Sequence, residues 1–159
     1  MTGIIIAGRT GAAFAAQLGT MQVNEEIDAY QTLGISAFDF LVLPRVLALM
    51  LMVPLLTLYS AFIGMLAGLL VSLTIFDIGV FEYYTETLRA LEFKQFAVGL
   101  SKGTVYGAIV AFAGCLRGMQ CGRSAEAVGH AATSAVVTAI LLITIAASIM
   151  TVVYYQLGI

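Results

Sequence analysis

The sequence predicts an all-α integral membrane protein with about three full transmembrane helices, the end of a fourth and a short helix between two of them. Of its 159 residues, 61% are hydrophobic and only 10% are charged, whereas an average soluble domain is about a quarter charged. Asp, Glu, Lys and Arg are absent from Val46 to Phe76 and from Ala127 to Ile159. Apolar runs of this length are typical of membrane spans, because about 20 helical residues cross a hydrocarbon core of ~30 Å.

We expect residues 1–159 to form a single transmembrane domain. Residues 1–21 are interrupted by Arg9 and rich in Gly and Ala, and we interpret them as the end of a span. Full spans are expected at residues 46–75, 96–116 and 133–155. The span at 46–75 would exceed the bilayer thickness at 1.5 Å per residue, so we expect it to tilt, to kink at Pro54 or to end before Phe76.

A short amphipathic helix is predicted over residues 22–34, in the first connection between spans. Asn24 is expected at its N-cap, acidic residues follow in the first turn, and Gly34 lies past its end. Three apolar or aromatic residues fall on one face, namely Val23, Ile27 and Tyr30. Such a helix lies on the membrane surface or docks into a partner.

Charge gives a small orientation signal. With alternating spans, the first connection and the third (residues 117–130) share a side of the membrane. They hold Arg45, Arg117 and Arg123, against Arg89 and Lys94 in the middle connection at 77–95. Three cations against two favours a cytoplasmic first and third connection.

Small residues recur at every fourth position in two segments. The positions are Ala7, Gly11, Ala15 and Gly19, then Gly99, Gly103, Gly107 and Ala111, with a further pair at Gly64 and Gly68. Such stripes let helix backbones approach closely in lipid. They fit packing within the chain or a subunit interface, and the sequence leaves both open.

Residues that could carry chemistry are few. His130 is the only histidine and has no triad companion, so we expect no catalytic site; Cys115 and Cys121 are expected to be free thiols without a metal. Gly118 to Ser124 lacks the spacing and the lysine of a phosphate loop, so ATP and magnesium would be bound by a partner subunit. Lys102 lies inside a span, which indicates a functional site by default, although its long side chain could also reach the membrane interface.

Several motifs are specific. They are Ala7-Gly8-Arg9-Thr10-Gly11, Gln17-Leu18-Gly19-Thr20-Met21, Glu25-Glu26-Ile27-Asp28-Ala29, Leu33-Gly34, Pro44-Arg45-Val46, Gly99-Leu100-Ser101-Lys102-Gly103 and Ala125-Glu126-Ala127-Val128-Gly129-His130. In this order and spacing the series resembles the MlaE/YrbE family, the permease subunits of ABC transporters that work with MCE-domain proteins. The resemblance extends over essentially the whole chain.

The resemblance implies a phospholipid-transport permease of the bacterial inner membrane that crosses it several times. Residues 22–34 would be the cytoplasmic coupling helix that sits in a groove of the ATPase subunit, with contact residues Glu25, Glu26, Asp28 and Tyr30. The 77–95 connection would be periplasmic. Arg9 and Lys102 would contact lipid headgroups or support the structure, and Gly19, Pro44, Arg45, Glu126 and Gly129 match family positions.

The implied partners are an ABC ATPase, an MCE-domain protein, a possible STAS-type subunit and a second copy of the permease. The substrate would be a phospholipid. Composition gives no sign of nucleic-acid binding, because no basic tract is present.

Three departures from the family pattern stand out. Gln17 and Ala147 occupy positions where family members commonly carry Glu and Asp, so acid-dependent roles there are in doubt. Family permeases also have a further N-terminal stretch, and we expect this chain to be a fragment, a gene product with a misplaced start, or a shortened protein. The alternative function is therefore a truncated, non-transporting protein that assembles with a full-length permease. A small self-assembling channel ranks last, because it leaves the 22–34 helix unexplained.

Overall fold

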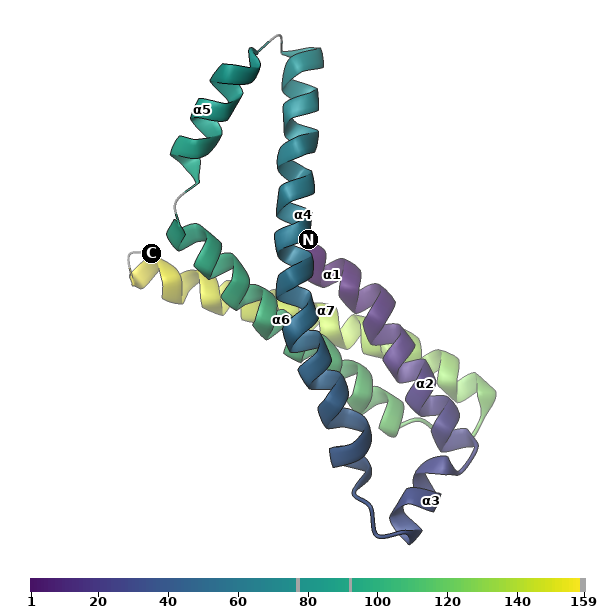
Figure 1. Ribbon diagram of the computed structural model, residues 1–159. Coiled ribbons are helices and arrows are strands. Elements are labelled where there is room, and N and C mark those ends of the chain that lie inside the picture. Colours follow the sequence, from purple (N-terminus) through teal and green to yellow (C-terminus); the bar gives the residue numbers. More distant parts are fainter. Residues whose placement is uncertain (77, 92, 158–159) are drawn as a thin grey trace.

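The computed structural model describes residues 1–76, 78–91 and 93–157, and within these ranges it contains helices and turns without a strand (Figure 1). The elements are α1 (Thr2–Ile6), η1 (Ala7–Gly11), α2 (Ala12–Val23), α3 (Glu26–Thr32), η2 (Phe38–Val42), α4 (Leu43–Ile75), α5 (Val80–Ala90), α6 (Phe93–Met119) and α7 (Ala125–Gln156), where η denotes a π-helical turn. Three helical stretches are long and apolar enough to cross a membrane: Phe38–Ile75, Lys94–Met119 and Ala125–Gln156. The predicted all-α membrane protein is confirmed.

Helices extend beyond the apolar runs from which their positions were predicted. α7 begins at Ala125, well before residue 133, because the Ser124 hydroxyl accepts a hydrogen bond from the Ala127 amide at 3.1 Å and caps the helix. The 77–95 connection contains α5, and two of its residues, Asp77 and Glu92, lie outside the described residues. Hydropathy indicates where a helix can cross lipid, whereas caps decide where it begins and ends.

The first three elements form one rod, in which α1, η1 and α2 follow each other in helical backbone conformation up to Val23 (Figure 1). Arg9 lies in the π-helical turn at the middle of this rod. π-helical turns inside α-helices occur frequently at functional sites. Arg9, the one Lys or Arg of the rod, thus lies at a helical irregularity of this kind.

The core lies where the rod, α6, α7 and the first half of α4 meet. Ala7, Ala15 and Ala111 are fully buried there. A Cβ atom added at Gly107 would lie 2.7 Å from the Leu49 carbonyl oxygen of α4. The two long stripes of small residues thus pack within the chain. Gly99 is the exception, since a Cβ atom there would meet nothing within 4 Å.

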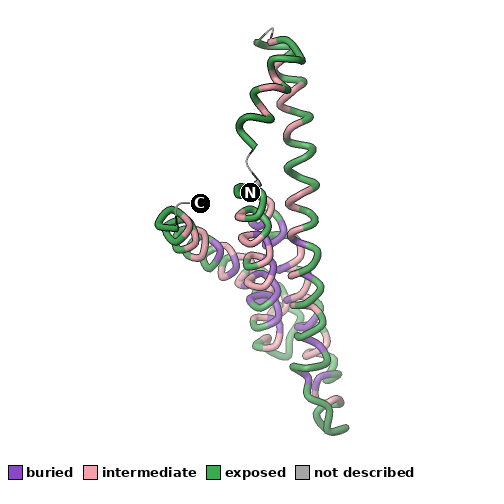
Figure 2. The backbone as a smooth tube through the Cα atoms, turned by 60° about the vertical axis from the view of Figure 1, so that its left-hand side comes forward, coloured by how far each residue is buried: buried purple, intermediate pink, exposed green. Residues whose placement is uncertain are grey.

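The second half of α4 and the whole of α5 lie outside this core, and Figure 2 shows buried residues confined to the other part of the molecule. Beyond Val53, α4 has no buried residue as far as Ile75. A hydrogen bond helps to join the two helices, because the Tyr83 hydroxyl donates to the Met65 carbonyl at 2.9 Å. Gly68 leaves room for that hydroxyl, which would lie 2.7 Å from an added Cβ.

The short helix of the first connection is present as α3, but its expected N-cap is wrong. Asn24 ends α2, and Glu25 occupies the N-cap of α3 in the left-handed conformation, with φ of 61°. The reason is that α2 continues to Val23, so the chain must turn sharply before the next helix begins. At the other end, Gly34 has φ of 74°, the left-handed conformation typical of a residue just past a helix.

Candidate functional site

Apolar contacts hold α3 against the bundle. Ile27 is only 3% exposed and belongs to a buried cluster with Leu18 of α2 and Cys115 of α6. The ring of Tyr30 packs against this cluster and lies 5.5 Å from the ring of Phe40. Of the face predicted from Val23, Ile27 and Tyr30, the last two lie on the inward face of α3, whereas Val23 is the last residue of α2.

The acidic residues at the start of α3 divide into two groups. Asp28 accepts a hydrogen bond from Nη2 of Arg123 at 2.7 Å, and Glu25 lies 3.6 Å from Nη1 of the same guanidinium. Glu26 is exposed and accepts a hydrogen bond from the Asn24 side-chain amide at 3.3 Å. Of the three predicted contact acids, Glu26 is the one that leaves its charge unpaired within the described part of the chain.

Gly19 lies where α2 meets the third connection. A Cβ atom added there would lie 3.2 Å from the sulfur of Cys121 and 3.4 Å from a methyl group of Val128. The absence of a side chain thus lets the third connection close over α2. Together with the Arg123 contacts, this brings the first and third connections to the same end of the molecule, which we call the α3 end.

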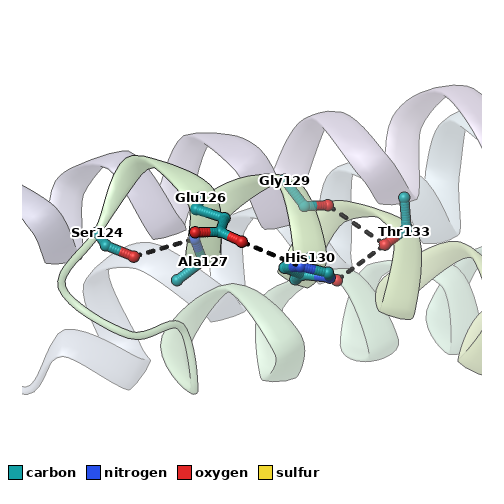
Figure 3. Close-up of polar contacts among 6 residues, drawn as sticks. All are labelled: Ser124, Glu126, Ala127, Gly129, His130 and Thr133. Carbon is teal, nitrogen blue, oxygen red and sulfur yellow. Dashed lines mark hydrogen bonds and ion pairs between the residues drawn. The ribbon is translucent and has the colours of Figure 1, made fainter.

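The start of α7 forms a capped and partly polar turn, shown in Figure 3. Besides the Ser124 cap, the Thr133 hydroxyl donates to the carbonyls of Gly129 and His130 at 3.3 and 3.0 Å. Glu126 lies 3.9 Å from His130, and both side chains are at least 80% exposed. An added Cβ at Gly129 would meet nothing within 4 Å, so Glu126 and Gly129 form an open surface.

Pro44 and Arg45 begin α4. Pro44 stands in the first turn of α4, directly after the π-helical turn η2, and its fixed φ of about −65° suits a helix. The Arg45 guanidinium lies 5.4 Å from the ring centroid of Phe14 on α2, and its Nη1 atom is buried without a hydrogen-bond partner. A cation over an aromatic ring is attracted electrostatically, so Arg45 helps to join α4 to α2.

Lys102 is held by α7. Its ammonium group donates a hydrogen bond to the Thr151 hydroxyl at 3.1 Å and lies 5.7 Å from the ring centroid of Tyr154. The Tyr154 hydroxyl lies 2.6 Å from the hydroxyl of Ser101. Lys102 makes no ion pair in the part of the chain that the structure describes, and its recorded contacts are neutral. Its side chain is thus directed to a neighbouring helix near the end of α7 opposite Ser124.

Arg9 borders a groove of about 480 Å³ between the rod and α4. The groove is lined by Thr2, Ile5, Ile6, Arg9, Thr10, Leu56, Tyr59 and Ser60. Hydroxyl groups and one guanidinium thus face an otherwise apolar space. Arg9 is exposed, and no contact in the described residues brings it together with Lys102.

Chemically, the two cations favour anions. Each cation has polar or aromatic neighbours and no carboxylate paired with it among the described residues, so its charge remains free to attract a phosphate or carboxylate. Among the same residues, no group of three or more His, Cys, Asp or Glu side chains is arranged to hold a metal ion. The two cations can therefore attract an anionic group.

Sequence reasoning missed the partners of these residues. Arg123 was counted only as a positive charge, although it contacts α3 across 95 positions. Thr151 and Tyr154 lie in an apolar run and gave no signal of their own. Thr151 and Tyr154 are three residues apart, which places them on one helix face. This spacing and the lysine in the preceding span were the only indication that they contact Lys102.

Known proteins are similar to this chain in sequence. The family described as "Permease MlaE" matches residues 1–153. A "Probable ABC transporter permease protein" of Rickettsia prowazekii (strain Madrid E) is 38% identical over 156 residues, which is 98% of this chain and 60% of that protein. A protein with the same description from Synechocystis sp. is 40% identical over 145 residues, covering 91% of this chain and 55% of the relative.

A plant protein is also similar. "Protein TRIGALACTOSYLDIACYLGLYCEROL 1, chloroplastic" of Arabidopsis thaliana is 37% identical over 156 residues, covering 98% of this chain and 45% of the relative. The chain thus spans about 60% or less of the length of these relatives.

Proposed function

The chain belongs to the MlaE permease family, and from this membership we propose that it is a permease subunit that moves phospholipids, driven by a separate ATPase subunit. The observation that carries the lipid part of the proposal is the pair of cations, Arg9 and Lys102, set among apolar helices without paired carboxylates in the described residues. A phospholipid combines an anionic headgroup with apolar chains, which matches such surroundings. The name of the similar Arabidopsis protein also contains that of a lipid.

The driving subunit would dock at the α3 end. α3 is short, is anchored by Ile27, and presents the exposed Glu26. A charge on an otherwise anchored surface helix provides an oriented contact for a basic groove in a partner. We place this end in the cytoplasm and the 77–95 connection in the periplasm of a bacterial inner membrane.

Further partners follow from the family proposal. An MCE-domain protein would receive or deliver the lipid on the α5 side, a STAS-type subunit could join the ATPase, and two copies of the permease would face each other. α4 beyond Val53 exposes apolar side chains such as Leu55, Phe62 and Leu70. In the assembly, lipid or protein would cover them.

Reconstitution of the transporter in vesicles tests this function. We expect a labelled phospholipid to pass between an acceptor membrane and vesicles holding the permease, its ATPase and the MCE-domain protein only when MgATP is supplied. Lys102→Met should lower the rate about tenfold or more, because a hydrogen bond to a charged group contributes about 1.5–3 kcal/mol. Lys94→Met, at the exposed start of the same helix, serves as the matched control.

Two results would contradict the proposal. ATP-independent or absent lipid movement by the wild-type assembly would exclude the transport function. Equal rates for wild type and Lys102→Met would exclude Lys102 from the lipid path, and insertion of the variant is checked by its yield in the membrane fraction.

A further inference from the structure

α3 is joined to the rest of the molecule by two kinds of contact. On one side Ile27 packs against Leu18, and α2 is the helix that lies closely beside α3. On the other side Arg123 reaches across from the third connection. In residues 1–76, 78–91 and 93–157, Arg123 makes the only ion pairs that join α3 or its N-cap residue to another segment. The ion pairs between the third connection and α3 in the described residues thus all involve the side chain of Arg123.

The backbone between α2 and α3 is not a continuous helix. Asn24 ends the first helix, and Glu25 turns the chain in the left-handed conformation before the second begins. Helical hydrogen bonding is therefore interrupted at this junction. The orientation of α3 depends on its side-chain contacts, among them the two carboxylates held by Arg123.

Arg123 is fixed to the start of α7. It directly precedes Ser124, the N-cap residue, whose hydroxyl accepts a hydrogen bond from the Ala127 amide at 3.1 Å. The Ser124 backbone is extended, with φ of −140° and ψ of 152°, as is usual for a capping residue. A displacement of α3 would therefore act on α7 through Arg123, which is separated from the first residue of α7 only by Ser124.

The same helix ends at the partners of Lys102. α7 runs without interruption from Ala125 to Gln156, and Thr151 and Tyr154 lie near its end. A continuous α-helix transmits a shift or tilt along its length, because each turn is hydrogen-bonded to the next. One element thus connects the Arg123 contact with the cation that we assign to the lipid path.

The ion pairs of Arg123 orient α3 rather than add much to the free energy of unfolding. The side chains of Arg123 and Glu25 are 61% and 69% exposed, and that of Asp28 is 41% exposed. Exposed ion pairs contribute little to stability. The planar guanidinium nevertheless fixes a direction, because it presents its donors in a rigid fork.

We propose that Arg123 is a positioning residue that couples α3 to α7, so that movement of α3 by a docked ATPase is passed to the Lys102 end of the bundle. This inference rests on the proposed function. It assigns to Asp28 and Glu25 an internal role and leaves Glu26 as the acid directed at the ATPase.

The test uses the assembled transporter and three variants. Arg123→Gln removes the charge, and Arg123→Asp combined with Asp28→Arg exchanges the two charges. Arg89→Gln is the control, because Arg89 forms an exposed ion pair with Glu86 at 3.4 Å within α5. Two quantities are measured: phospholipid molecules moved per ATP hydrolysed, and the hydrogen-exchange rates of the α3 amides.

We expect Arg123→Gln to lower the lipid moved per ATP about fivefold or more, the lower range of coupling between linked sites. ATPase binding and thermal stability should stay near wild-type values, and α3 amides should exchange faster. The charge exchange should restore both quantities, and Arg89→Gln should match wild type. A merely structural role would instead change yield and stability without changing the ratio.

An unchanged ratio in Arg123→Gln would overturn the coupling role. A charge exchange as defective as Arg123→Gln would also overturn it, because Arg123 would then act through a contact other than Asp28. If wild type itself moves no lipid with ATP, the proposed function fails. Hydrogen exchange then still decides whether Arg123 orients α3, and unchanged α3 exchange would refute that as well.

Discussion

Glu25 combines two constraints at one position. It is the only non-glycine residue with positive φ in the described chain, and its carboxylate faces Arg123. The left-handed conformation is unfavourable for residues with a Cβ atom, whereas glycine adopts it freely. The junction between α2 and α3 therefore contains local backbone strain.

This strain can be measured by comparing two substitutions at Glu25. Both Glu25→Gly and Glu25→Ala remove the carboxylate, so the ion pair with Arg123 is lost equally. We expect Glu25→Gly to be more stable than Glu25→Ala by about 1 kcal/mol, measured by thermal unfolding in detergent. Equal stabilities would mean that the backbone at residue 25 is not left-handed in the protein.

The sequence singles out residues whose type is unusual for their surroundings, and the functional roles of Lys102 and Arg9 stay predictions. Lys102 and Arg9 stood out because cations are rare in spans, and Gly34 because a glycine followed a helical pattern. Asn24 was misplaced because cap preferences are short-range, and its position depends on how far α2 continues. Thr151 and Tyr154 could not be identified, since their hydroxyl groups acquire a role only when Lys102 is brought to them.

At the level of elements, the approach of α4 to α6 depends on glycine. Added Cβ atoms at Gly107 and Gly103 would lie 2.7 Å from the Leu49 carbonyl oxygen and 3.2 Å from the Thr57 hydroxyl. The Leu49 oxygen belongs to the backbone and cannot rotate away. α6 must therefore shift if a side chain is added at Gly107.

Two substitutions on α6 separate packing from helix propensity. Gly107→Ala should destabilise the protein by about 1–3 kcal/mol, because overpacking forces backbone shifts. Gly99→Ala should be neutral or stabilise it by up to about 1 kcal/mol, since alanine favours helix and nothing lies nearby. Thermal unfolding of both variants measures the difference, and equal destabilisation would contradict the packing of α4 on α6.

The elements themselves were largely predictable, because three of them are set by long apolar runs. The sequence also indicated that small residues pack against helices, but it could not say whether those helices belong to one chain. Only the structure shows that Ala7, Ala15 and Gly107 contact α4, α6 or α7 of the same chain. The span predicted at 133–155 lies within α7, which begins earlier, at Ala125, and carries Glu126 and His130 in its first turns.

At the scale of the whole molecule, the α3 end joins segments that are distant in sequence. Arg123 lies 95 positions from Asp28, and Gly19 meets Cys121 and Val128. Alternating spans require the two connections to lie on one side, but they do not specify which side chains meet. Such pairing depends on the packing of the rod, α6 and α7 together, which no local pattern encodes.

The central claim is that the ATPase subunit docks on α3 and acts on this permease through it. The most direct test of this claim is the affinity of the ATPase subunit for variants of the purified protein. Glu26→Lys reverses the free acid of α3, and Glu82→Lys reverses an exposed acid on α5 as the matched control. We predict that Glu26→Lys weakens binding about tenfold or more, or about 1.4 kcal/mol, because like charges then face each other. Glu82→Lys should bind as wild type does. Equal affinities for all three proteins would contradict the account.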